Sequence, residues 1–213
     1  NANTSFESTY VSSYDEVLFN PIIKALQNQS ANKFIVVHLM GNHTAYAKRY
    51  PHTFSFFSQS TSYENQIRNE YDNSIRYNDF IVDSILNIIQ NYESKHQNIK
   101  CSALYLSDHG ENVYDENGNV GHDYSGTIPK ANVEVPYILW LSTQFIKTET
   151  NKVDIIKKNR NKPFVSDDLF HNLIDMFDIK CSVFEKSRSL FNNEYNANRK
   201  RILEDNLDYD LKK

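Results

Sequence analysis

Three stretches of the chain repeat their apolar residues at helical spacing. The first runs over residues 13–27, where Ser13 occupies the expected N-cap and acidic residues follow in the first turn. The second, over residues 64–92, carries a wide apolar stripe and predicts one long amphipathic helix. The third, over residues 166–177, begins with polar residues that favour a helix N-terminus and predicts a helix with one buried face.

Three shorter apolar runs have the length of strands. They lie at residues 33–38, 103–106 and 135–141, and Pro136 stands near the start of the last run, where a strand tolerates it. Unbroken apolar runs are typical of strands that are buried on both faces of a parallel sheet. The alternation of helices and strands therefore predicts the α/β class, with a largely parallel open sheet flanked by helices.

The five glycines of the chain fall in two loops that follow predicted strands. Gly41 lies in a loop that also holds His43, and the other four lie in a loop that contains Asp108, His109 and His122. In an open parallel sheet, ligands collect beyond the carboxyl ends of the strands. If the two strands are neighbours, these four side chains converge. Ordinary turn chemistry explains either loop alone, but the two together favour a site.

Composition limits the classes of function. The chain has 213 residues, a formal net charge of -4 and a pI near 6.0, which give no electrostatic case for a nucleic-acid partner. No apolar stretch approaches the roughly 18 residues that span a bilayer, and the N-terminus has no signal-peptide pattern, so the chain as given is expected to be soluble. Its two cysteines, Cys101 and Cys181, fit two buried free thiols as well as one disulfide.

Carboxylate and imidazole side chains together favour zinc as the bound metal. Asp oxygen and His nitrogen suit zinc, whereas magnesium or calcium prefers more oxygen donors. The adjacent pair Asp108 and His109 supplies half of a four-ligand zinc site. The alternative is structural: His109 caps a turn, Asp108 binds loop amides and His122 is only an exposed residue. His38, at the end of an apolar run, is interpreted as a core histidine rather than a ligand.

Six short blocks, in a fixed order, carry a resemblance to a known family. They are His38-Leu39-Met40-Gly41-Asn42-His43, Arg49-Tyr50-Pro51, Tyr71-Asp72-Asn73-Ser74-Ile75, Ser107-Asp108-His109-Gly110-Glu111, Gly121-His122 and Val135-Pro136-Tyr137-Ile138-Leu139-Trp140. This series resembles the bacterial phosphoethanolamine transferases that modify lipopolysaccharide, which belong to the alkaline phosphatase and sulfatase superfamily. The resemblance covers roughly residues 13–195, and the order of the blocks is stronger support than any one motif.

This resemblance implies a catalytic domain at the periplasmic face of the bacterial inner membrane, carried by a membrane-embedded N-terminal region. It implies transfer of phosphoethanolamine from phosphatidylethanolamine to a lipid A or core-sugar acceptor, through a phospho-threonine intermediate at zinc. By motif position, Asp108 and His109 are zinc ligands. His43 and His122 contact the phosphoryl group or a second zinc, and one of them protonates the leaving group.

Two departures from the family qualify these expectations. The family's nucleophilic threonine and another acidic zinc ligand lie on segments that precede the matched part. Residues 1–213 are therefore expected to form a single partial domain that binds zinc weakly and does not turn over, with a mobile start at 1–12 and a mobile charged tail at 196–213. Serines in segment 57–70 stand where many relatives carry cysteines, which leans towards a core-sugar acceptor.

Two other classes of function stay open. Another hydrolase of the superfamily, a sulfatase or phosphodiesterase, shares the Asp-His-Gly block and the fold, and the nucleophile on the preceding segment distinguishes it from a transferase. A non-catalytic binding module with a decayed site makes a different prediction. In that case, replacing Asp108 or His109 by alanine changes neither zinc content nor cellular function.

Overall fold

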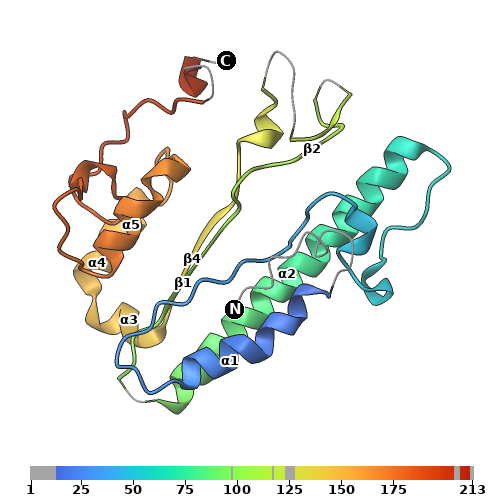
Figure 1. Cartoon of the computed structure of the whole chain (residues 1–213). Helices are drawn as coiled ribbons and strands as arrows, with labels where there is room; N and C mark the ends of the chain where they lie inside the picture. The colour runs from blue at the N-terminus through green and yellow to red at the C-terminus, as the bar shows by residue number, and fades with distance from the viewer. Residues whose placement is uncertain (1–12, 97, 117, 123–127, 204–206, 212–213) are drawn as a thin grey trace. The chain divides into compact units, whose positions relative to one another are not determined.

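The chain folds into two compact units, residues 1–142 and residues 143–213, which are described here one at a time (Figure 1). The structure is a computed structural model. The single domain expected from the sequence stays a prediction, and the start at 1–12, expected to be mobile, lies outside the described residues. The residues that the structure describes are 13–96, 98–116, 118–122, 128–203 and 207–211.

The first helical segment begins later than its sequence pattern predicts. A 3-10 turn, η2 (Asp15–Leu18), precedes helix α1 (Phe19–Gln27), and no side chain caps either N-terminus. Ser13 is therefore not the N-cap, and that prediction was wrong. Pro21 is the third residue of α1, where the amide that proline lacks has no partner inside the helix, so the helix tolerates it.

Helix α2 (Tyr63–Lys95) confirms the long amphipathic helix, and Ser62 caps it by accepting a hydrogen bond from the Asn65 amide. The helix supplies Tyr77 and Ile81 to the core of the first unit and packs against helix α1 (Figure 1). Partly buried side chains surround this core, and they are largely aromatic: Tyr14, Phe19, Leu39, Phe54 and Ile85. Edge-to-face rings hold it together, because such pairs add attraction beyond their buried area.

The main strand pair is antiparallel, which corrects the largely parallel arrangement predicted from the sequence. Strands β1 (Ser102–Leu106) and β4 (Tyr137–Leu141) lie where strands were predicted, and Leu106 pairs with Tyr137 (Figure 1). The physical reason is the connection between them. A parallel neighbour needs a crossover that returns the chain to the starting edge, usually through a helix, and the described residues between β1 and β4 contain no α-helix that could form such a crossover.

The predicted strand at residues 33–38 is extended but belongs to neither sheet of the described chain. Phe34 is 65% exposed and Val36 is 77% exposed, and His38 is exposed as well, so its interpretation as a core histidine was wrong. An apolar run indicates that its side chains favour burial, but it does not specify which strand pairs with it. Neither sheet within the described ranges extends over this segment.

The loop between β1 and β4 has its own small framework. Strands β2 (Asn112–Val113) and β3 (Val120–Gly121) pair in antiparallel fashion, with Asn112 opposite Gly121. A 3-10 turn, η5 (Lys130–Asn132), follows. Strands of two residues are too short to show a periodic pattern, so they could not be predicted from the sequence. Two further 3-10 turns, η3 (Tyr46–Lys48) and η4 (His52–Phe54), lie in the loop before α2.

The regular elements described in the second unit are helices and 3-10 turns, apart from an isolated bridge between Ile202 and Asp208. It contains α3 (Thr143–Thr148), α4 (Thr150–Asn159), η6 (Ser166–Asp168), α5 (Leu169–Met176), η7 (Lys186–Arg188) and η9 (Tyr209–Leu211). Together, η6 and α5 confirm the helix that was predicted over 166–177. None of the helices in the described part of the chain is long and apolar enough to cross a bilayer. Cys101 and Cys181 are both free and half-buried, which matches the free-thiol alternative.

A buried carboxylate joins Arg199, in the C-terminal tail, to the helical part of the second unit. Asp168 is almost fully buried, and its two oxygens accept hydrogen bonds from Arg188 Nε and, at 3.2 Å, from Arg199 Nη1. Arg199 also pairs with Asp167 at 2.8 Å. The pKa of Arg199 is raised, first by its hydrogen bond to Asp167. Residue 199 lies within the tail that was expected to be mobile, and it is held by these two carboxylates.

We expect Asp168→Ala to lower the free energy of unfolding by about 3–5 kcal/mol, because the change leaves two guanidinium groups without their buried partner. Urea denaturation followed by circular dichroism measures the loss. The matched control is Glu194→Ala, which removes the exposed partner of Lys186 and is expected to cost less than about 1 kcal/mol. Equal losses in the two variants would contradict the prediction.

Candidate metal and phosphoryl site

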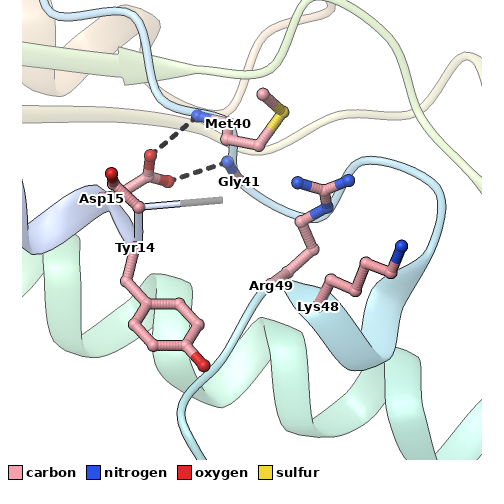
Figure 2. A pocket seen from close by; sticks show the side chains of 7 residues that line it. Tyr14, Asp15, Met40, Gly41, Lys48 and Arg49 are labelled. Atoms are coloured by element: carbon pink, nitrogen blue, oxygen red, sulfur yellow. Dashed lines mark hydrogen bonds between the residues drawn. The ribbon is translucent and has the colours of Figure 1, made fainter. Parts of the chain in front are cut away.

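The first histidine loop is anchored at its start by one carboxylate. Asp15, in η2, accepts hydrogen bonds from the amides of Met40, at 3.0 Å, and Gly41, at 2.9 Å (Figure 2). Gly41 has φ of +55°, which a residue with a side chain rarely adopts. Asp15 therefore holds the turn that carries the chain from the extended segment towards His43. If the Asp15 side chain capped the first helix instead, the Met40 and Gly41 amides would lose this hydrogen-bond acceptor.

Arg49 closes the same loop from inside. Its side chain is buried, its Nε donates to the His43 carbonyl at 3.0 Å, and its Nη2 donates to the Thr44 carbonyl at 2.9 Å. Burial lowers the pKa of Arg49, while the nearby Asp15 carboxylate acts in the opposite direction. Arg49 thus fixes the backbone of the loop. The His43 side chain is left exposed. Arg49 lines a small pocket with Ser13, Tyr14, Asp15, Met40, Gly41 and Lys48 (Figure 2).

The second histidine loop begins directly after β1. Asp108 Oδ1 accepts from the His109 amide at 3.0 Å, and the Asp108 side chain is 85% exposed. The same Oδ1 lies 3.9 Å from His109 Nε2. On the other side of the ring, His109 Nδ1 lies 2.8 Å from the Gly110 carbonyl oxygen. The turn therefore presents one carboxylate oxygen and one ring nitrogen on the same side.

Gly110 is required by a close approach of backbone. A Cβ atom at this position would lie 1.9 Å from the Ala131 carbonyl oxygen, a distance that no real side chain tolerates. The Gly110 amide donates to the Asn132 carbonyl at 2.9 Å, and the Asn132 side-chain amide donates to the His122 carbonyl at 3.1 Å. Asn132 thus connects the segment that carries His109 to the segment that carries His122.

Glu111 connects three parts of the first unit. One carboxylate oxygen, Oε1, accepts a hydrogen bond from Tyr46 Oη, and the other, Oε2, lies 3.2 Å from His122 Nδ1. Tyr46 belongs to the loop that also holds His43, so the two histidine loops meet here. Burial, followed by the hydrogen bond to Glu111, raises the pKa of Tyr46 well above its ordinary value.

The structure brings together only part of the predicted set. His109, Glu111 and His122 each offer a ligand atom, and these atoms lie within 4.8 Å of one another. The His109 and His122 rings lie 4.2 Å apart, centroid to centroid. Asp108 and His43 are outside this group, and their roles stay predictions. Sequence reasoning did not select Glu111 or Tyr46 as site residues, although Glu111 is three residues from Asp108.

The donor set fits zinc. Two imidazole nitrogens with carboxylate oxygens close by are ligands that zinc favours, and zinc–nitrogen and zinc–oxygen distances are about 2.0–2.2 Å. The 3.9 Å between Asp108 Oδ1 and His109 Nε2 therefore lets both atoms reach one ion. A calcium or magnesium ion would need more oxygen donors than the group offers.

The chain belongs to the sulfatase family, whose model matches residues 2–179. With this match, the sulfatase-like fold class that was inferred from the sequence is confirmed, and mixed helix and sheet is what the structure contains.

The relatives described next are all phosphoethanolamine transferases. Over 182 residues it is 31% identical to the phosphoethanolamine transferase EptA of Escherichia coli strain K12, covering 81% of this chain and 32% of the relative. The chain thus spans about a third of the length of the curated relatives it matches. The C-terminal periplasmic domain of the transferase EptC from Campylobacter jejuni is similar in structure, with a TM-score of 0.73 and 30% identity over 89% of this chain and 61% of that one.

A second solved structure has the same fold. It is the C-terminal periplasmic domain of EptC from Escherichia coli in complex with Zn, with a TM-score of 0.78, at 23% identity over 98% of this chain and 65% of that one. The expected resemblance to phosphoethanolamine transferases is confirmed by the two relatives that are 30% and 31% identical to this chain.

We expect Gly110→Ala to disrupt the site more than an ordinary glycine replacement. The new methyl group must displace the Ala131 carbonyl, and overpacking of this kind costs about 1–3 kcal/mol in free energy of unfolding. Because Asn132 joins both histidine segments, the imidazole NMR signals of His109 and His122 are expected to shift together.

The control is Gly118→Ala in the same loop. Gly118 has φ of +64° but open space where a Cβ would lie, so alanine meets only backbone strain of about 1–2 kcal/mol. The imidazole signals are expected to stay in place. If both variants move the imidazole signals alike, the close contact at Gly110 does not organise the site.

Proposed function

We propose that this chain is part of an enzyme that transfers phosphoethanolamine from phosphatidylethanolamine to a lipid A or core-sugar acceptor of lipopolysaccharide. The observation that carries the proposal is the group formed by His109, Glu111 and His122, next to Asp108, in a chain whose relatives are named phosphoethanolamine transferases. Phosphoryl transfer needs such groups, because charge and protons both move in the reaction.

The side chains take the roles that their positions support. Asp108 Oδ1 and His109 Nε2 would hold zinc, and the similar periplasmic domain in complex with Zn supports this choice of metal. When bound, zinc supplies positive charge that stabilises the developing charge on phosphoryl oxygens. His122 and His43 contact the phosphoryl group or a second zinc, and one of them gives a proton to the leaving oxygen. The exposure of His43 leaves its ring accessible to a substrate.

The remaining parts of the proposal lie outside the described site. We propose a threonine nucleophile outside residues 1–213, which forms a phospho-threonine intermediate, and a location at the periplasmic face of the inner membrane. The relatives whose names specify a periplasmic domain support that location. Residues 1–213 alone are then expected to show no transferase activity.

Zinc titration of the metal-free chain tests the ligand roles. We expect isothermal titration calorimetry to show zinc binding by residues 1–213, weakened at least about tenfold in His109→Ala and Asp108→Ala, since each removes a ligand atom. The matched control is His52→Ala, because His52 is exposed and outside the group. Unchanged affinity in both site variants would contradict the metal site and favour a decayed binding module.

Mass spectrometry of lipopolysaccharide tests the reaction. Cells that express the full-length protein are expected to add phosphoethanolamine, whereas the Asp108→Ala and His122→Ala forms are not. His52→Ala again serves as the control. Release of sulfate or phosphate from model esters without any modified lipopolysaccharide would identify a hydrolase of the superfamily instead. Turnover by residues 1–213 alone would place the nucleophile within them.

A further inference from the structure

We propose that Glu111 and Tyr46 are positioning residues for His122. In this arrangement Tyr46 holds the Glu111 carboxylate, and the carboxylate holds the His122 ring in the tautomer that carries its proton on Nδ1. The unprotonated Nε2 is then left for the metal or the phosphoryl group. The inference deepens the proposed function and rests on it for its meaning in catalysis, but its first readout is independent of catalysis.

The surroundings of Glu111 give the first argument. Its side chain is only 10% exposed, and both oxygens are engaged, Oε1 by the Tyr46 hydroxyl and Oε2 by His122 Nδ1 at 3.2 Å. Glu111 belongs to the group that fits a metal. Ligation by Glu111 would compete with these two hydrogen bonds for the same oxygens. Orientation of a neighbouring histidine uses both bonds as they stand.

The protonation state of Tyr46 sets the direction of the hydrogen bonds. Tyr46 is buried, and its pKa is raised by that burial and by Glu111, so the phenol keeps its proton. The phenol therefore donates, and the carboxylate accepts. An ionised carboxylate has no hydrogen to donate at either oxygen, so its contact with His122 Nδ1 is a hydrogen bond only when that nitrogen carries a hydrogen.

Packing against neighbouring residues holds Tyr46 in place independently of its hydrogen bond to Glu111. Its ring meets Tyr71 edge to face, with centroids 5.1 Å apart, and η3 packs against helix α2. The Tyr46 hydroxyl is thus a fixed donor on a rigid support, whereas the Glu111 side chain has three rotatable bonds. Removing the hydroxyl alone preserves the ring packing and frees the carboxylate.

His109 reaches the same tautomer by a different route. Its Nδ1 lies 2.8 Å from the Gly110 carbonyl oxygen, which can only accept, so Nδ1 carries the hydrogen and Nε2 does not. With Glu111 acting on His122, both rings have an unprotonated Nε2, and the rings lie 4.2 Å apart.

Long-range hydrogen–nitrogen NMR correlation of the imidazole rings tests the tautomer in the metal-free chain, at about pH 8, above the ordinary imidazole pKa of about 6.5. His122→Asn assigns the signals. We expect His122 to carry its proton on Nδ1 in the unmodified chain. In Glu111→Ala we expect the proton on Nε2, the tautomer that free histidine prefers, and in Tyr46→Phe a mixture of the two.

Zinc affinity gives a second readout that separates positioning from ligation. Tyr46→Phe removes no atom that ligates a metal. If His122 Nε2 ligates a second zinc, we expect the change to weaken the binding of that zinc about tenfold, as the loss of partners to metal ligands does, whereas contact of His122 with the phosphoryl group alone leaves zinc affinity unchanged. The matched controls are Tyr92→Phe and Glu70→Ala. The Tyr92 ring lies against His96, Glu70 accepts from Gln66, and neither residue belongs to the group. Both controls are expected to leave the tautomer and the affinity unchanged.

Two results would overturn the proposal. One is a His122 ring that carries its proton on Nε2 in the unmodified chain, and the other is a Tyr46→Phe variant that matches Tyr92→Phe in both tautomer and zinc affinity. These outcomes differ from a failure of the proposed function. If the chain binds no zinc but shows the expected tautomers, the positioning role stands and the metal role falls.

Discussion

The antiparallel pairing of β1 with β4 is the constraint on which the candidate site depends. Leu106 lies opposite Tyr137, so the thirty residues between them leave and return at the same edge. Closing a loop of that length costs conformational entropy. The hydrogen bonds and packing of the β1–β4 pair, which stands at the two ends of the loop, offset this cost. Asp108, His109, Glu111 and His122 therefore all lie in one loop that is closed by the β1–β4 pair, and Tyr46 reaches Glu111 from the preceding loop, which also holds His43.

Inside the loop that the β1–β4 pair closes, hydrogen bonds take the place of regular secondary structure. Asn132 is the main connection, because its carbonyl accepts from Gly110 and its side chain donates to the His122 carbonyl. Burial of the Glu111 side chain adds an electrostatic constraint. A buried carboxylate needs hydrogen-bond donors, and Tyr46 and His122 are the ones that the structure places beside it. The same bonds that make burial tolerable also fix the His122 ring.

Sequence patterns predicted the elements better than their pairing. Helix α2, the strands β1 and β4, and the last helix of the 166–177 stretch all form, because their patterns reflect a local period and a demand for burial. The predicted parallel direction of the strands was wrong, since direction depends on where the connection between two strands returns. The apolar run at 33–38 shows the same limit, because its local pattern does not specify a partner strand. Motifs selected His43, Asp108, His109 and His122. The structure brings His109 and His122 together, and the roles of all four stay predictions. Glu111 was not selected, because its role comes from contact with Tyr46, sixty-five positions earlier.

Asparagine illustrates why the rest escaped prediction. In the sequence its abundance indicates only a polar surface, yet several asparagines are among the most buried side chains. Asn73 accepts from the amides of Phe56 and Phe57, and Asn159 donates to the carbonyls of Leu190 and Asn192. A side-chain amide offers both donors and an acceptor, so it can satisfy irregular backbone that no helix or ladder satisfies. A fold with long irregular loops needs such groups inside, and their positions follow from the path of the loops, which no periodic pattern records. Polar residues in this chain are therefore as much a part of the interior as the aromatic core.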